Sequence, residues 1–130
     1  MSAISHSPPG KIKLHKQSQQ LELHFGSEQF LLSAEFLRVY SPSAEVKGHG
    51  PGQEVLQFGK KDVAINGIER AGNYALKLIF SDGHDSGIFT WSYFYDLGKN
   101  QEQLWADYLQ KLHDAGKSRE KDTSVVKFIN

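Results

Sequence analysis

The seven residues from Tyr74 to Phe80 read YALKLIF, with a large apolar residue at every second position. A period of two places these side chains on one face of a β-strand, whereas an α-helix repeats every 3.6 residues. Residues that favour tight turns flank the run, at 71–73 before it and at Asp82-Gly83 after it. The pattern therefore predicts a central strand with one face in the core, and it argues against an all-helical bundle.

Shorter runs of alternating or β-branched residues predict the other strands. They fall at residues 12–14, 21–25, 30–32, 54–58, 63–69 and 88–89. Most of these runs are separated by short turns, such as the glycine-containing turn at residues 26–28, and short turns join antiparallel neighbours. We therefore expect a mainly antiparallel β-sheet.

Two shorter segments have the start and stop signals of helices. The first is Glu35–Tyr40, where Ser33 can cap the N-terminus and Pro42 stops the helix. The second is expected to begin after Thr90, which can also act as a cap, and to end at Gly98.

The longest helix is predicted at residues 101–115, with Gly116 closing its C-terminus. Its apolar stripe consists of Leu104, Tyr108, Leu109 and Leu112. The predicted fold class is therefore α+β: a single domain with a mainly antiparallel β-sheet, and with a short helix and a longer C-terminal helix packed on it.

The length of 130 residues suits one domain with a single core. Paired prolines near the start resist both helix and sheet, so residues 1–10 are expected to be a flexible N-terminal segment. The domain is expected at residues 11–116, and residues 117–130 are expected to be a C-terminal tail.

Basic and acidic residues are balanced overall but not along the chain. Lys plus Arg and Asp plus Glu both number 15. Both ends are basic, so residues 21–116 keep eight basic and thirteen acidic residues, a net charge of −5. Phosphate binding needs a concentrated basic face, so we expect no nucleic-acid partner.

The chain contains no cysteine, which excludes disulfides, thiolate metal sites and cysteine nucleophiles. No apolar run approaches the ~18 residues that a membrane span requires. The first residues also lack the apolar core of a signal peptide. We therefore expect no membrane partner and a cytoplasmic location.

The segment SDGHDSG, residues 81–87, contains the residues with the most versatile chemistry. His84 stands between Asp82 and Asp85, an arrangement that suits a metal site, an acid–base pair or only a tight turn. Ser86 is close by, but a nucleophile–base–acid chain needs side chains that converge from separate segments. Hydrolase chemistry within this loop is therefore disfavoured, and we expect no catalytic residues.

Two stretches, LRVYSPSAEVKGHGPG and GIERAGNYALKLIFSDGHDSGIFTWSYFYDLG, resemble the small-domain family called DUF971, also described as the N-terminal domain of γ-butyrobetaine hydroxylase. The resemblance extends over residues 11–113, and DGHDSGIFTWSYFYDLG is its most specific part. In the hydroxylases it implies a domain that precedes a catalytic domain binding iron and 2-oxoglutarate. The iron ligands belong to that catalytic domain, so hydroxylase activity is not carried over to this chain.

The resemblance also implies a zinc ion held by three cysteines and one histidine. Here Ser41, Ser43 and Val46 stand at the cysteine positions, and His84 stands at the histidine position. A structural zinc needs four good ligands, and a serine hydroxyl is a poor ligand at neutral pH. We therefore expect no cofactor, and we expect these three residues to fill the space around His84 instead.

Other residues could rebuild a metal site. If the loop GHGPG folds over the turn at Gly83, His49 and His84 would converge with Asp82 or Asp85. Two imidazoles and one or two carboxylates suit Fe(II), Mn or Zn. We favour the alternative, in which His84 hydrogen-bonds within its turn and His49 is solvated, because His and Asp are common in turns for local reasons.

Two functional hypotheses follow. The first is a stand-alone, non-catalytic binding or accessory module with a protein partner. The domain family also resembles segments fused to P-loop iron–sulfur carrier proteins, which implies a link to iron or iron–sulfur metabolism. The second is a small metal-binding protein or metal-dependent enzyme that uses His84, His49 and nearby carboxylates.

Overall fold

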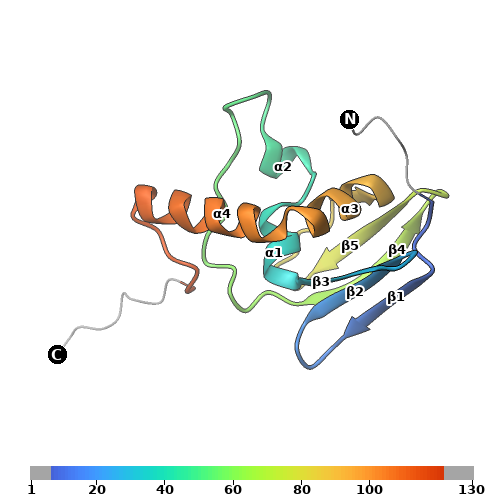
Figure 1. Ribbon diagram of the computed structural model, residues 1–130. Helices are drawn as coiled ribbons and strands as arrows, with labels where there is room; N and C mark the ends of the chain where they lie inside the picture. Colours follow the sequence, from blue (N-terminus) through green and yellow to red (C-terminus); the bar gives the residue numbers. More distant parts are fainter. Residues whose placement is uncertain (1–6, 122–130) are drawn as a thin grey trace.

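In the computed structural model, which describes residues 7–121, the strands form two three-stranded antiparallel sheets (Figure 1). The first sheet has the order β1-β2-β3, with β1 at Lys11–His15, β2 at Gln20–Phe25 and β3 at Glu28–Ser33. The second sheet has the order β4-β5-β6, with β4 at Ile65–Ala71, β5 at Ala75–Phe80 and β6 at Ile88–Thr90.

Over the same residues the helices are α1 at Ala34–Val39, α2 at Ala44–Lys47, α3 at Trp91–Lys99 and α4 at Gln101–Ala115. Helices α1, α3 and α4 lie together on one side of the strands, and α2 projects beyond α4 with the loop that follows it (Figure 1). As predicted, α4 is the longest helix. No helix between residues 7 and 121 is long and apolar enough to cross a membrane.

The predicted α+β class with antiparallel strands is confirmed, but the strands divide between two sheets instead of forming one. Residues 34–64, which include α1 and α2, separate β3 from β4. Gln19 links the starts of α1 and β4: its carbonyl accepts from the amide of Ala34 at 2.9 Å, and its Oε1 accepts from the amide of Ile65 at 2.8 Å.

Strand β5 is the central strand of its sheet, as its alternating sequence predicts, and it pairs with both β4 and β6. Leu76, Leu78 and Phe80 are 5%, 0% and 1% exposed, so the alternation marks the core face. Tyr74 begins the same pattern but lies in the turn before the strand and is 66% exposed.

The core is built from the inner faces of both sheets and from α1 and α3. Its largest apolar members with almost no exposure are Phe36, Phe80, Phe89, Phe94, Leu21, Leu23, Leu32, Leu37 and Leu78. Burying one such side chain stabilises a fold by about 1.5–3 kcal/mol, so this cluster supplies most of the driving force. Tyr108 and Leu112 of α4 form a smaller cluster with Val39.

The predicted helix caps are present. The Oγ of Ser33 accepts from the amide of Phe36 at 3.0 Å, and the Oγ1 of Thr90 accepts from the amide of Tyr93 at 3.1 Å. Gly116 ends α4 with φ at 66°, a left-handed conformation that glycine adopts without strain.

Two details of the predicted helices are wrong. Helix α3 does not end at Gly98 but continues to Lys99, and Gly98 lies where a Cβ atom would approach the ring of Phe30 to 2.4 Å. Glycine is therefore needed for close packing and not for termination. On α4, Leu109 is 41% exposed, and the buried stripe is formed by Tyr108 and Leu112 with partly buried neighbours.

The strand predicted at residues 54–58 is also wrong, because this segment belongs to neither sheet. Its amide at Val55 donates to the carbonyl of Val46 at 2.8 Å, and the hydroxyl of Tyr108 donates to the carbonyl of Gln57 at 2.8 Å. Single contacts to α2 and α4 thus replace a ladder of backbone bonds.

The start of the predicted C-terminal tail lies against the domain. The amides of Gly59 and Lys61 donate to the carbonyls of Ser118 and Arg119 at 2.9 and 3.0 Å. Arg119 donates two hydrogen bonds, at 2.8 and 2.7 Å, to the carboxylate of Glu35, which is 6% exposed. Its guanidinium also lies 5.2 Å from the centre of the Trp105 ring. Residues 1–6 and 122–130 of the predicted end segments lie outside the described residues.

We expect Arg119→Ala to lower the free energy of unfolding by about 1–3 kcal/mol. Removing one partner of a fully buried ion pair costs about 3–5 kcal/mol, and the 39% exposure of the Arg119 side chain reduces this. The measurement is urea unfolding, with Arg70→Ala as a control at an exposed arginine. Adding Glu35→Gln should restore part of the loss, and equal effects of the two arginine variants would contradict the interpretation.

Candidate functional site

The site is built around His84, which lies in the connection from β5 to β6 and is 6% exposed. The amide of Phe80 donates to the His84 carbonyl at 2.9 Å, which closes the turn at the end of β5. Ser41 and Ser43 approach the imidazole from the segment between α1 and α2, and Glu45 approaches it from α2. We call these four residues the His84 cluster.

Both ring nitrogens of His84 are used. Its Nδ1 lies 2.9 Å from Oε1 of Glu45, and its Nε2 lies 2.9 Å from Oγ of Ser41 and 3.3 Å from Oγ of Ser43. A carboxylate can only accept, so Nδ1 carries the proton and Nε2 accepts from a serine hydroxyl. The imidazole is therefore satisfied in its neutral form.

A glycine allows the two segments of the cluster to meet. At Gly87 a Cβ atom would lie 2.2 Å from Oγ of Ser41 and 3.4 Å from Cδ of Pro42. No larger residue fits there unless the serine moves. The close approach of β6 to the end of α1 thus depends on the glycine that precedes the strand.

The surroundings of His84 keep it neutral. Burial lowers the pKa of His84, and the nearby charge of Arg38 lowers it further, while Glu45 and Asp82 act in the opposite direction. Arg38 itself is buried, with 7% exposure. The balance favours the uncharged imidazole.

Asp82 fixes the turn beside His84 through ion pairs. Its Oδ2 accepts from Nε of Arg38 at 2.9 Å and from Nζ of Lys60 at 2.6 Å, and its Oδ1 accepts from the His84 amide at 3.3 Å. Burial alone would raise the pKa of Asp82, but the hydrogen bond from Lys60 and the charge of Arg38 lower it to about 2. Asp82 is thus ionised and compensated by two cations.

The four residues predicted as possible metal ligands are not gathered into one site. His84 and Asp82 are neighbours engaged with other groups, Asp85 is exposed, and His49 is exposed on the loop after α2. Between residues 7 and 121 no group of three or more His, Cys, Asp or Glu side chains is placed to hold a metal ion. Metal binding by these four residues stays a prediction.

Two of the three residues at the positions of the zinc cysteines contact His84, as expected. Ser41 and Ser43 contact the imidazole, and Val46 is buried on the same segment with 8% exposure. The resulting donor set, with one imidazole, two hydroxyls and an aliphatic side chain, does not fit a structural zinc ion. Both ring nitrogens of His84, the atoms that could bind a metal ion, already have hydrogen-bond partners within the protein.

Ser41, His84 and Glu45 also follow the order of a serine–histidine–acid triad. Their burial is the reverse of what a hydrolase needs, because Ser41 is 1% exposed and the Glu45 side chain is 71% exposed. A nucleophile must reach its substrate, whereas this serine is enclosed. The arrangement therefore serves to hold two segments together.

A groove opens beside the cluster. It has a volume of about 990 Å³ and lies between the segment 46–57 and helix α4. Ser41 belongs to both the groove wall and the His84 cluster. Val46 also lines the groove, and Tyr93 and Tyr108 add aromatic surface. The hydroxyl of Tyr93 donates to the carbonyl of Tyr40 at 2.6 Å.

Sequence reasoning found His84, Ser41, Ser43, Val46 and Asp82, but it missed three residues that complete the site. These are Glu45, Arg38 and Lys60. Of these three residues, only Glu45 is close in the sequence to a predicted site residue, because it follows Ser43 by two positions. Arg38 and Lys60 approach Asp82 from positions 44 and 22 residues away.

Comparison with known proteins gives a consistent result. The family model for "Gamma-butyrobetaine hydroxylase-like, N-terminal" matches residues 12–95. A solution NMR structure is 56% identical over 97% of this chain and 100% of that chain, with a TM-score of 0.81. A second NMR structure is 48% identical over 98% and 97% of the two chains, with a TM-score of 0.78.

A crystal structure is more distantly similar. It is that of a protein of unknown function from Acidithiobacillus ferrooxidans ATCC 23270 which belongs to the DUF971 family. It is 33% identical over 69% of this chain and 91% of that chain, with a TM-score of 0.58. No curated protein matches this sequence.

We expect His84→Ala to lower the free energy of unfolding by about 1–3 kcal/mol, because buried hydroxyl groups lose their partner. His49→Ala, at an exposed position, is the control and should have no effect. A strong chelator should leave the melting temperature of the parent unchanged. A large drop in melting temperature on chelation would show that a bound metal supports the fold.

The pKa of His84 also predicts a pH dependence. The folded state resists protonation of His84, whereas the unfolded chain binds that proton near the ordinary value of 6.5. Stability should therefore be constant above this pH and fall as the pH decreases below it. A second loss should follow below 3.8, where Asp82 is protonated more readily in the unfolded chain.

Urea unfolding between about pH 5 and 8 isolates the first window, which contains the ordinary titration range of histidine. In His84→Gln the slope in this range should be smaller than in the parent, while the loss at lower pH remains. Parallel curves for the two proteins would show that another group is responsible.

Proposed function

Because the chain belongs to the gamma-butyrobetaine hydroxylase-like N-terminal family, we propose that it acts as a non-catalytic binding or accessory module that recognises a protein partner. The observation that carries this proposal is the groove of about 990 Å³ between the segment 46–57 and α4. Aromatic and aliphatic side chains line much of it, as is usual for surfaces that bind other molecules.

The chemistry of the His84 cluster supports a non-catalytic role. Its serine is enclosed, its imidazole is neutral and bonded on both sides, and its carboxylate holds the imidazole. Each of these groups therefore forms its hydrogen bonds with another group of the cluster. The cluster positions the wall of the groove, and the groove makes the contact with the partner.

We further propose that the partner belongs to iron or iron–sulfur metabolism. This part rests on the resemblance to segments fused to iron–sulfur carrier proteins and is an inference from fold-level association.

The first test is capture of a partner from a native extract by chemical cross-linking to the untagged chain. We expect a protein that forms a complex of defined stoichiometry when both components are purified, measured by analytical ultracentrifugation. The heat-unfolded chain is the control for non-specific adhesion. Failure to reconstitute any complex would overturn the proposal.

The second test measures metal in protein purified without an affinity tag. We expect far less than one equivalent of zinc, iron or manganese. About one equivalent that is lost in His84→Ala, with or without loss in His49→Ala, would identify a metal-binding protein or metal-dependent enzyme instead.

A further inference from the structure

The segment Glu54–Phe58 has the sequence of a strand but lacks strand partners. Residues 53–58 contain no helix, strand, turn or bend, and they run past α4 in Figure 1. Within the described part of the chain, the amides of Leu56, Gln57 and Phe58 donate to no other group. The segment therefore presents unused backbone donors at the rim of the groove.

The side chains of this segment add apolar surface. Val55 and Phe58 are 52% and 46% exposed, while Leu56 packs against the small cluster that includes Tyr108. Val55 and Leu56 also line the groove, opposite Tyr108 and Ala115 of α4. Alternate amides of an extended segment lie on the same edge, so the free amides of Leu56 and Phe58 are the pair to which an extended peptide can add as a strand.

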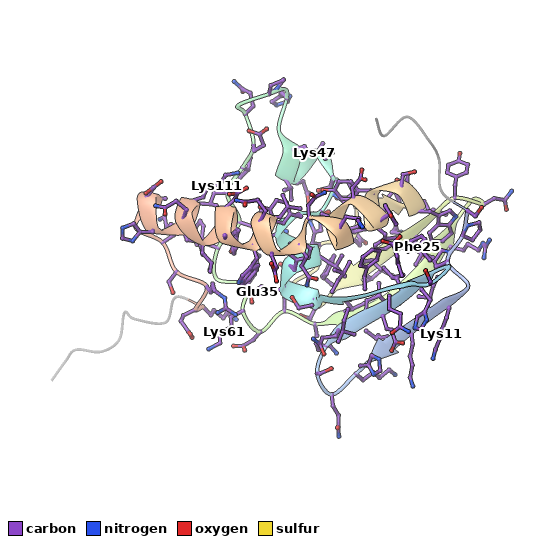
Figure 2. The ribbon with its side chains drawn as sticks, in the orientation of Figure 1. Lys11, Phe25, Glu35, Lys47, Lys61 and Lys111 are labelled. Atoms are coloured by element: carbon purple, nitrogen blue, oxygen red, sulfur yellow. The ribbon has the colours of Figure 1, made fainter. Side chains whose placement is uncertain are left out.

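The charges around the groove define the chemistry of such a peptide. Lys47 lies on α2 and Lys111 on α4, and both line the groove (Figure 2). Among residues 7–121 neither lysine forms an ion pair; Lys47 lies over the ring of Tyr93 at 5.1 Å, near the groove wall. Both cations are available to a carboxylate of a partner.

Two acidic residues, Glu54 and Asp114, also line the groove. Asp114 accepts from Nε2 of Gln110 at 2.9 Å, and Glu54 begins the free segment without a cation beside it. A complementary peptide therefore carries an acidic residue for the lysines of the groove.

We infer that the edge 54–58 is the docking site for an extended apolar segment of a protein partner, which carries an acidic residue for Lys47 and Lys111 and adds as a strand beside the groove. This inference rests on the proposed function and identifies the surface that binds the protein partner. Backbone bonds to the free amides hold the peptide, and alternate apolar side chains enter the groove.

The test uses a phage-displayed library of random linear peptides, selected on the full chain, followed by synthesis of the enriched peptides. We expect enriched sequences with alternating apolar residues and an acidic residue to one side. In NMR titrations the amides of residues 54–58 and the groove wall of α4 should shift. Methylation of alternate peptide nitrogens should abolish binding, because a strand uses alternate backbone groups.

Two variant pairs give matched comparisons. Lys47→Glu with Lys111→Glu should weaken binding at least about tenfold, and Lys13→Glu with Lys77→Glu, on the sheets, should leave it unchanged. Phe58→Pro removes an amide that the fold does not use, and Phe58→Ala removes the same side chain but keeps that amide. We expect Phe58→Pro to bind more weakly than Phe58→Ala, with equal melting temperatures.

The possible failures are distinguishable. If the chain forms a complex with its captured partner but the shifts map to another surface, the docking site is wrong and the proposed function stands. If no partner forms a complex, the proposed function fails. Concentration-dependent dimers with shifts at 54–58 would assign the edge to a second copy of the chain. Peptide binding only after removal of residues 122–130 would assign the edge to that segment. Either result would overturn the inference.

Discussion

The imidazole of His84 connects two parts of the chain that are far apart in the sequence. Its Nε2 contacts Ser41, at the end of α1, and its Nδ1 contacts Glu45, within α2. Helix α2 has four residues, too few to be stable on its own. The position of α2, and of the loop after it, therefore depends on bonds to a histidine anchored at the end of the central strand.

This dependence extends to the groove. Val46 and Lys47 lie on α2, and the amide of Val55 is bonded to the carbonyl of Val46. The wall formed by the segment 46–57 is thus linked to the His84 cluster through a short chain of contacts. A polar cluster whose hydrogen-bonding groups are satisfied can specify one arrangement, so the His84 cluster contributes to binding by fixing the shape of the groove wall.

Local signals explain which parts of the fold were predictable from the sequence. The strand from Ala75 to Phe80, the caps Ser33 and Thr90, and the stop at Gly116 depend on a few neighbouring residues. The missed features depend on distant ones. Gly98 has the local pattern of a helix stop, but its role is to allow the close approach of Phe30. Residues 54–58 have the local pattern of a strand, but no strand of either sheet pairs with them. In the site, the serines around His84 were predicted from the family resemblance, while the roles of Arg38 and Lys60 emerge only from the folded arrangement.

The ion pair between Glu35 and Arg119 joins residues separated by 84 positions. During synthesis at about 5–20 residues per second, roughly 4–17 s pass between the addition of the two residues. During this interval α1 has a carboxylate that the folded protein buries and no arginine to compensate it. The ribosome must moreover release the segment after α4 before that arginine can reach α1. The domain consequently completes its folding only after residue 119 has left the ribosome, and shortened chains that lack this residue are the forms most exposed to chaperones and proteases.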